Sequence, residues 1–167
     1  MAPEGSIGAE IGVATGQLTQ RFMELRHFSS FHAVDKWDDH HDTQEYESAV
    51  RLLEPYESKL VIHRMEAKEW LSQIDDGILG FIYIDCYAKN GQEKGAILDA
   101  AWPKLAEGGL FAGDDYETRY PVTVESVDRF AADHDKKVNV YDRHLNKLMA
   151  GECKSVWDRS QSWYIRK

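Results

Sequence analysis

The segment Gly80-Phe81-Ile82-Tyr83-Ile84-Asp85 shows no polar alternation until its final carboxylate. Such a pattern is typical of a strand that is buried on both faces of a parallel sheet. On either side of this segment, short runs of β-branched or aromatic residues alternate with longer segments whose apolar residues recur three and four positions apart. This alternation predicts βαβ units, and therefore an α/β domain with a mostly parallel sheet.

The same two patterns locate the individual elements. We expect strands at residues 7–13, 31–34, 60–62, 80–85, 110–112, 138–141 and 162–165. We expect helices at residues 18–25, 43–53, 67–74, 93–105 and 121–133. Thr43 is the predicted cap of the second helix, and Pro121 fits the first turn of the last one.

Length and composition narrow the class of protein. The 167 residues, of which 43% are hydrophobic, suit one domain over residues 1–167. A formal charge of −9 argues against nucleic acid as a partner. No apolar run approaches the ~20 residues that span a bilayer, and no signal peptide is recognisable, so we expect a cytoplasmic protein without membrane contact. Two cysteines, Cys86 and Cys153, are too few for a disulfide framework and are predicted to be free thiols.

Acidic residues follow several of the predicted strands. Asp35 follows the second strand, Asp85 ends the fourth, and Asp114 and Asp115 follow the fifth. Ligands of open α/β sheets bind beyond the carboxyl ends of the strands, so these side chains are expected at one ligand-binding edge. Carboxylates that share a cleft repel one another, and they therefore require a cation or hydrogen-bond donors.

The segment Glu10-Ile11-Gly12-Val13-Ala14-Thr15-Gly16 ends the first strand and opens a helix. Its glycines allow the backbone to pass close to a ligand. It lacks the lysine of a phosphate-binding loop, and Ala14 stands where a dinucleotide-binding loop needs its second glycine. Asp35 is placed to accept hydrogen bonds from ribose hydroxyls. Together these features predict a bound nucleoside without a pyrophosphate.

Four motifs carry a resemblance to a known family. They are Glu10-x-Gly12-x-x-x-Gly16, Val34-Asp35-x-Trp37, Phe81-Ile82-Tyr83-Ile84-Asp85, and Trp102-Pro103-x-Leu105-x-x-Gly108-Gly109 followed by Gly113-Asp114-Asp115-Tyr116. In this order and spacing they resemble the class I S-adenosylmethionine-dependent methyltransferases, and within them the metal-dependent small-molecule O-methyltransferases of the macrolide-sugar and catechol kind. The resemblance implies a three-layer Rossmann-like sandwich with a mostly parallel seven-stranded sheet and an antiparallel last strand.

The resemblance also implies a set of site residues. S-adenosylmethionine would be bound by Glu10, Gly12, Gly16, Asp35, Trp37, Glu66, Ala67 and Asp85. A divalent metal, Mg²⁺, would be held by Asp85, Asp114 and Asp115. Such an ion would orient the acceptor hydroxyl and lower its pKa. The expected function is Mg-dependent O-methylation of a small hydroxylated molecule, such as a sugar or phenol.

Two departures from the family pattern leave alternatives open. The relatives often place a basic residue three positions after the first metal ligand, where this chain has Ala88. Lys89, one position later, is assigned with Asp85 as catalytic, and Tyr87 and His144 are other candidate bases. The relatives also have helices before the first strand that cover the substrate, whereas this sequence shows no evident N-terminal lid. A second subunit in a homodimer, a bulky substrate in an open cleft, or a truncated relative would each explain this difference.

Two other functions are compatible with these residues. One is a cofactor-binding module that serves as a partner subunit, and the other is a metal-dependent enzyme of different chemistry on the same scaffold. The run Asp38-Asp39-His40-His41-Asp42 has a second interpretation as a metal site, but neighbouring residues on a loop rarely converge on one ion, so a solvated acidic loop is expected. His32 and His63 lie within predicted strands and are expected to be hydrogen-bonded core residues.

Overall fold

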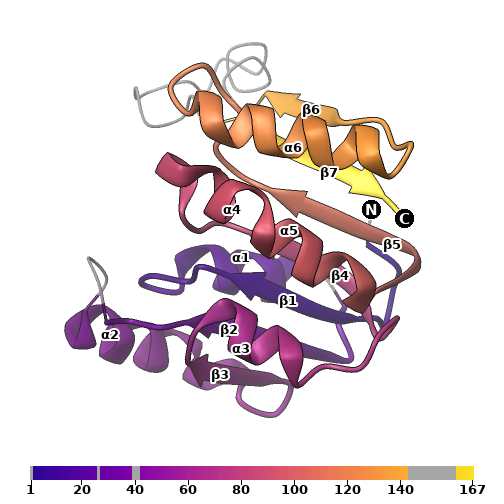
Figure 1. The fold of residues 1–167 in the computed structure, drawn as a ribbon. Helices are drawn as coiled ribbons and strands as arrows, with labels where there is room; N and C mark the ends of the chain where they lie inside the picture. The colour runs from indigo at the N-terminus through magenta and orange to yellow at the C-terminus, as the bar shows by residue number, and fades with distance from the viewer. Residues whose placement is uncertain (1, 26, 39–41, 143–160) are drawn as a thin grey trace, which may run out of the picture.

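The computed structural model describes residues 2–25, 27–38, 42–142 and 161–167, and in these ranges a seven-stranded sheet lies between two layers of helices (Figure 1). The strands are β1 (Ile7–Ile11), β2 (Ser30–Asp35), β3 (Leu60–Arg64), β4 (Leu79–Ile84), β5 (Leu105–Gly113), β6 (Asn139–Asp142) and β7 (Gln161–Arg166). Their order in the sheet is β3-β2-β1-β4-β5-β7-β6. The first five strands in this order, β3, β2, β1, β4 and β5, pair in parallel. Strand β7 is antiparallel to both β5 and β6. The predicted fold class, including the antiparallel last strand, is confirmed.

The helices divide between the two faces of the sheet. They are α1 (Gln17–Leu25), α2 (Thr43–Leu53), α3 (Ala67–Ser72), α4 (Gly91–Lys94), α5 (Ala96–Ala101) and α6 (Pro121–Asp133), with short 3₁₀ turns η1 (Glu54–Tyr56), η2 (Ala88–Asn90) and η3 (Trp102–Lys104). Apolar residues of α1 and α2 join one core cluster, and those of α3, α5 and α6 join the other. Among the described residues, no helix has the length and apolar character needed to cross a membrane.

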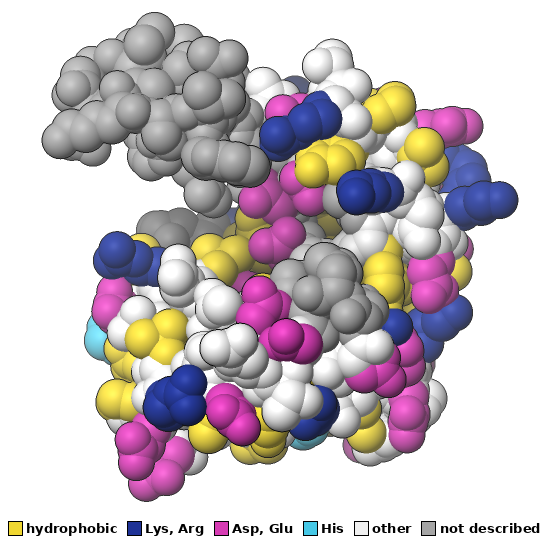
Figure 2. Space-filling view, turned by 90° about the vertical axis from the view of Figure 1, so that its left-hand side faces the viewer, with side chains coloured by type: hydrophobic (Ala, Val, Ile, Leu, Met, Phe, Trp, Pro, Cys, Tyr) yellow, Lys and Arg dark blue, Asp and Glu magenta, His cyan; other side chains and the backbone are white. Residues whose placement is uncertain are grey.

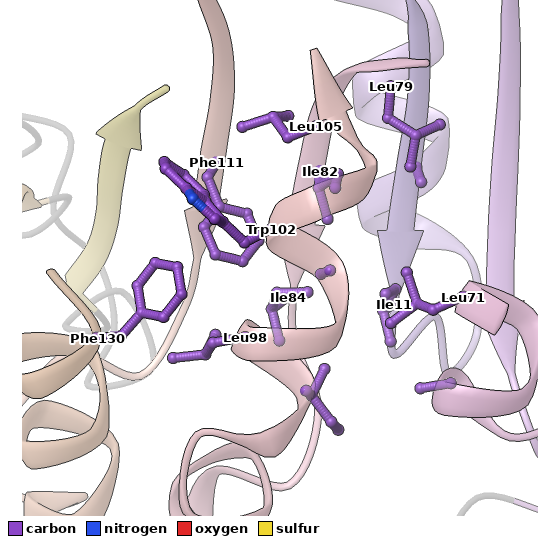
Figure 3. Packing of buried hydrophobic residues seen from close by; sticks show 14 of the residues in the cluster. Ile11, Leu71, Leu79, Ile82, Ile84, Leu98, Trp102, Leu105, Phe111 and Phe130 are labelled. Carbon is purple, nitrogen blue, oxygen red and sulfur yellow. The ribbon is translucent and has the colours of Figure 1, made fainter. Parts of the chain in front are cut away.

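Strand β4 lies at the centre of the sheet and links the two cores. All six of its residues are buried, as predicted. Ile82 and Ile84 belong to the cluster shown in Figure 3, whereas Phe81 and Tyr83 belong to the cluster on the α1 and α2 face. Phe111 of β5 packs edge-on against Trp163 of β7, with ring centroids 5.2 Å apart. Apolar side chains therefore fix the strands on both faces, and the loops at their carboxyl ends start from a rigid base.

The predicted helix over residues 93–105 exists, but its bounds are wrong. Residues 91–95 all have positive φ and form a left-handed turn, and α5 begins only at Ala96. This helix ends at Ala101, because Pro103 lies in the next turn, η3. Strand β5 starts at Leu105 rather than at residue 110.

The predicted cap of α2 is also wrong by one residue. Thr43 is the first helical residue, and Asp42 is the N-cap. The Asp42 carboxylate accepts hydrogen bonds from the backbone amides of Gln44 and Glu45. A carboxylate satisfies these unpaired amides and also interacts favourably with the helix dipole.

Helix α6 ends in a left-handed C-terminal cap at Asp135, a position that glycine favours. The Lys136 amide bonds to the Ala131 carbonyl at 2.8 Å, the Asp135 amide bonds to Ala132, and Asp135 has φ +52°. Glycine adopts this conformation without the steric cost that a Cβ imposes. We expect Asp135→Gly to raise the free energy of unfolding by about 0.5–1 kcal/mol in urea titrations. Asp135→Ala is the matched control and should be less stable than wild type; equal stability of the glycine and alanine variants would contradict this prediction.

Two histidines pair on the α3 face of the sheet. Nδ1 of His32 on β2 lies 2.9 Å from Nε2 of His63 on β3, and both rings pack against Trp70. Burial lowers the pKa of His32, and burial followed by the charge of His32 lowers the pKa of His63. Both are hydrogen-bonded residues at the edge of the core, as expected.

These lowered pKa values make stability depend on pH. Below the ordinary histidine pKa of about 6.5, the unfolded chain takes up protons that the folded chain excludes. The pair therefore contributes stability above about pH 6.5, and this stability is lost as the pH falls towards the folded pKa values. We expect a loss of about 1 kcal/mol between pH 7 and pH 5, less than the maximum because both rings are partly exposed. Urea titrations across this range should show a shallower pH dependence for His32→Gln; an unchanged slope would contradict the assignment, and His27→Gln is the control for removal of an exposed histidine.

Candidate active site

A cleft of about 560 Å³ opens at the carboxyl ends of β1, β2 and β4. It is lined by Ile11, Gly12, Val34, Asp35, Lys36, Met65, Ala67, Asp85, Cys86, Tyr87, Lys89, Asn90, Asp115 and Tyr120. Figure 2 faces this edge of the sheet and shows Asp and Glu side chains gathered around a hollow. The size of the cleft falls in the usual range for small-molecule and cofactor sites.

The loop between β1 and α1 lies close to the loop after β4 because Gly12 has no side chain. Gly12 has φ +94°, and a Cβ at this position would lie 2.1 Å from the carbonyl oxygen of Asp85. Gly16 has a different role, since a Cβ there would meet Leu53 and Ala49 of α2 at 3.1–3.3 Å. Gly12 therefore shapes the cleft, whereas Gly16 allows α1 to pack against α2.

Asp35 holds two loops together at the floor of the cleft. Its Oδ2 accepts hydrogen bonds from the amides of Val13 at 2.8 Å and Ala14 at 2.9 Å. Its Oδ1 accepts one from the amide of Trp37 at 3.1 Å. A carboxylate offers about four acceptor positions, so these three bonds leave room for one further donor, such as a ribose hydroxyl.

Trp37 does not line the cleft, contrary to the expectation that it contacts the cofactor. It is 1% exposed and belongs to the core on the α1 and α2 face. Its indole Nε1 donates to the Ala14 carbonyl at 2.8 Å, and its ring packs edge-on against Tyr46. With φ +47° at Trp37, the ring fills the core beneath the β1–α1 loop, which it braces.

Glu10 lies behind this loop and is buried on β1. Thr19 of α1 donates a hydrogen bond to its Oε2, while Oε1 has no hydrogen-bond partner among the described residues. Burial raises the pKa of Glu10 well above its ordinary value, and the nearby charges of Asp85 and Asp35 raise it further, against the opposing effect of the Thr19 bond. A buried, unpartnered carboxylate oxygen is unusual and points to a donor or water that completes the site.

Glu66 stands at the outer side of the cleft. It is the N-cap residue of α3, and its two oxygens contact Lys36 Nζ at 3.3 Å and the Tyr87 hydroxyl at 3.2 Å. Lys36, Tyr87 and Ala67 line the cleft, whereas Glu66 does not. Burial, and then the Glu66 charge, raise the pKa of Tyr87 to about 12, so this phenol is protonated at neutral pH.

The three predicted metal ligands do not converge. Asp85 and Asp115 line the cleft, but Oδ1 of Asp114 accepts a hydrogen bond from Ser162 of β7 at 3.2 Å. Within the part of the chain that the structure describes, no three His, Cys, Asp or Glu side chains form a group suited to one metal ion. Asp114, which the resemblance assigned to a metal, is thus hydrogen-bonded to the antiparallel strand β7.

Asp115 is a partly buried carboxyl group on the cleft wall. Burial, followed by the charges of Asp114 and Glu117, raises its pKa to about 6, and Arg119 opposes this shift. Its backbone has φ +61°. Positive φ also occurs at Ala14, Trp37 and Tyr87, so non-glycine residues with this backbone follow β1, β2, β4 and β5. Strained backbone of this kind clusters at ligand-binding sites.

The structure therefore brings together only part of the predicted site. The predicted residues that line the cleft are Gly12, Asp35, Ala67, Asp85, Tyr87, Lys89 and Asp115. Those that do not line it are Glu10, Gly16, Trp37, Glu66 and Asp114. His144 and residues 39–41 of the acidic loop lie outside the described residues.

Lys36, Asn90 and Tyr120 are among the cleft residues that sequence reasoning missed. Lys36 directly follows Asp35, so the rule that ligands bind after parallel strands would have found it if extended by one residue, whereas Asn90 lies six residues after the end of β4. Tyr120 comes from the start of α6, and no pattern in the sequence marks it.

Comparisons with known proteins give a family match and a similar fold. Residues 9–116 match a family model described as a methyltransferase domain. No curated protein matches the sequence. The fold is similar to a precorrin-6y C5,15-methyltransferase from Geobacter metallireducens, with 14% identity, a TM-score of 0.69, and coverage of 98% of this chain and 81% of that one. It is also similar to an S-adenosylmethionine-dependent O-methyltransferase from Thermotoga maritima, with 16% identity, a TM-score of 0.67, and coverage of 99% and 60%.

The family match begins within β1 at residue 9 and includes the loop that Asp35 holds, β4, and both aspartates after β5. The strand order and the antiparallel β7 extend the likeness to the remainder of the described chain. This chain therefore belongs to the class I S-adenosylmethionine-dependent methyltransferases.

Proposed function

We propose that this protein transfers a methyl group from S-adenosylmethionine to a hydroxyl oxygen of a small molecule, such as a sugar or phenol. The observation that carries the proposal is the cleft at the carboxyl edge, in which the Asp35-bound loops meet Asp85 and the polar residues Lys89, Asn90 and Asp115. The family match supports methyl transfer, and the hydroxyl acceptor follows from the sequence resemblance.

The cleft fits a cationic nucleoside. Asp35 has an acceptor position left for a ribose hydroxyl, and Gly12 keeps the loop beside it free of side-chain atoms. The carboxylates of Asp35, Asp85 and Asp115 favour a positively charged ligand over a phosphate. When bound, S-adenosylmethionine supplies an activated methyl group on a sulfonium, and the protein contributes position and electrostatics.

The acceptor is assigned to the half of the cleft away from Asp35. Lys89, Asn90, Asp115 and Tyr120 line the cleft, and we assign them to the acceptor. A hydroxyl oxygen that gains a methyl group must lose its one proton, and the group proposed to receive it is either the Asp115 carboxylate or Lys89 in its uncharged amine form. Asp85 lies between the two halves and is proposed to position both ligands.

The proposal includes no step at a metal ion. Among the described residues, which include Asp85, Asp114 and Asp115, no three His, Cys, Asp or Glu side chains form a group suited to one metal ion. A divalent cation that rearranged Asp114 would appear as a dependence of the activity on Mg²⁺, which is measured below.

The test measures transfer of a labelled methyl group from S-adenosylmethionine to a panel of sugars and phenols. The control for each acceptor is the same compound with its hydroxyl groups already methylated. We expect product only from free hydroxyls, with little change when a chelator is added. Replacement of the residue that receives the proton, by Lys89→Met or by Asp115→Asn, should lower turnover by at least about tenfold. No product from any acceptor, despite tight cofactor binding, would overturn the proposal in favour of a cofactor-binding module.

A further inference from the structure

The segment that follows β4 carries cleft residues at its start and packs against α6 at its end. Tyr87, Lys89 and Asn90 line the cleft. The next five residues, 91–95, all have positive φ, and we call them the left-handed turn. Helix α4, which forms most of this turn, lies beside α6 (Figure 1). The chain therefore passes directly from the cleft at Asn90 to a buried position at Gly91.

Contacts with α6 hold the left-handed turn in place. A Cβ on Gly91 would lie 2.4 Å from the Val122 carbonyl oxygen, so the backbone of Gly91 lies directly against α6. Gln92 is 1% exposed, and Arg129 donates a hydrogen bond to the Lys94 carbonyl. The residue that precedes the turn therefore starts from a closely packed and rigid base.

Hydrogen bonds inside the segment fix the side chain of Asn90. Its Oδ1 accepts a hydrogen bond from the Glu93 amide at 2.9 Å, as the N-cap of α4. Its own backbone amide donates to the Tyr87 carbonyl at 3.1 Å. Because the Glu93 amide can only donate, the side-chain oxygen of Asn90 is assigned to this bond, and the side-chain NH₂ group is left to bind a ligand. Asn90 therefore presents a hydrogen-bond donor to a ligand in the cleft.

The chemistry of methyl transfer limits which oxygen of an acceptor this donor suits. The reacting hydroxyl oxygen gives an electron pair to the methyl carbon, the carbon–sulfur bond breaks, S-adenosylhomocysteine leaves, and the proton passes to Asp115 or Lys89. A hydrogen bond donated to that oxygen weakens as the oxygen gives up its electron pair, so it would oppose the reaction. A second oxygen on the acceptor accepts the bond without this cost and orients the reacting hydroxyl.

We infer that Asn90 is an acceptor-binding residue whose side-chain NH₂ group selects small molecules that carry a second oxygen in addition to the reacting hydroxyl. The inference rests on the proposed function, because it takes the acceptor to lie beside Lys89, Asn90, Asp115 and Tyr120. It adds a substrate class, since simple phenols without another oxygen become poor acceptors. A site built to hydrogen-bond a substrate oxygen disfavours an analogue that lacks it, because the buried donor is then left unpaired.

The test compares acceptors of matched shape. Each of the three methoxyphenols is paired with the ethylphenol in which a CH₂ group replaces the ether oxygen, and methyl glucoside is paired with its monodeoxy analogues. We expect kcat/KM of at least one oxygen-bearing compound to exceed that of its matched partner by about fivefold to tenfold, with most of the difference in KM.

Two variants separate acceptor binding from helix capping. Asn90→Asp keeps an oxygen for the Glu93 amide and so preserves the cap, but it has no NH₂ group. Asn90→Ser also caps the helix, with a shorter side chain and no added charge. Both should raise the KM of the preferred acceptor at least about fivefold, affect its matched partner much less, and change the Kd of S-adenosylhomocysteine by less than about twofold. Gln73→Glu, the same change from amide to acid at an exposed position on α3, is the control.

The outcomes distinguish the role of Asn90 from the methyl transfer itself. Equal kcat/KM within every pair, or an unchanged KM in Asn90→Asp, would overturn the role of Asn90. A residue that only caps the helix gives this second result, because aspartate caps as well as asparagine. Product from none of these compounds, with a protein that binds S-adenosylhomocysteine, would overturn the proposed function instead.

Discussion

Gly12→Ala is expected to abolish cofactor binding and to unfold much of the protein at 25 °C. Its Cβ would lie 2.1 Å from the Asp85 carbonyl oxygen, which is a backbone atom at the end of the central strand and has no freedom to move aside. The φ of +94° adds the strain of a left-handed backbone. Together these effects should lower the free energy of unfolding by on the order of 4 kcal/mol, a large part of the stability of an ordinary domain. Urea titration and calorimetry with S-adenosylhomocysteine measure the two effects.

Gly77→Ala separates the overlap from the backbone strain. Gly77 has φ +73°, but nothing lies within 4 Å of the position its Cβ would take. This variant should lose only about 1–2 kcal/mol, since it pays for the backbone conformation alone. Similar losses in the two variants would show that the loop and Asp85 are farther apart than described.

Asp35→Ala is expected to weaken S-adenosylhomocysteine binding by at least about 100-fold and to lower stability by about 2–4 kcal/mol. The three amides of Val13, Ala14 and Trp37 would lose a charged acceptor, and the loops after β1 and β2 would lose their common anchor. Binding should fall for both reasons, because Asp35 also lines the cleft. Calorimetry measures affinity, and urea titration measures the free energy of unfolding.

Two matched variants isolate the role of the carboxylate. Asp35→Asn keeps one carbonyl oxygen as an acceptor and should fall between wild type and Asp35→Ala in both measurements. Asp38→Asn removes a neighbouring acid whose side chain is 75% exposed and whose contact with Lys36 is 3.9 Å long. It should change neither measurement by much, and an effect as large as that of Asp35→Ala would assign the loss to net charge rather than to the loop contacts.

The sequence was sufficient to predict the sheet and the edge at which the cleft opens. The uninterrupted apolar run of β4 marks a strand buried on both faces, and strands of this kind occur in parallel sheets whose ligands lie at the carboxyl ends. Asp35, Asp85 and Asp115 were found at the cleft because each lies at the carboxyl end of a strand or within two residues beyond it. Local pattern and topology determine such positions together.

The directions of individual side chains could not be predicted from the sequence. Trp37 follows the cofactor-side aspartate, yet its indole turns into the core because its backbone has positive φ, which no residue pattern announces for a tryptophan. Asp114 was assigned to a metal, but Ser162, 48 positions later, donates a hydrogen bond to it. That contact depends on the pairing of β7 with β5, a long-range feature that local sequence does not specify.

The left-handed turn at residues 91–95 escaped prediction for a related reason. Gln92, Glu93 and Lys94 are ordinary helix formers, and their sequence predicts a right-handed helix. The segment packs against α6, since a Cβ on Gly91 would lie 2.4 Å from the Val122 carbonyl oxygen, Gln92 is buried, and Arg129 donates a hydrogen bond to the Lys94 carbonyl. Tertiary contact thus overrides helix propensity in the segment that carries Lys89 and Asn90 to the cleft.

The most direct test of a cofactor site in this cleft is calorimetric titration of the wild-type protein with S-adenosylhomocysteine, beside ADP as a phosphate-bearing control. One molecule bound per chain with a micromolar Kd, and no heat from ADP, is the expected result, because the three carboxylates that line the cleft, Asp35, Asp85 and Asp115, outnumber its two lysines and disfavour a phosphate. No binding of S-adenosylhomocysteine by a folded sample, or tighter binding of ADP, would contradict the assignment of the cleft to S-adenosylmethionine.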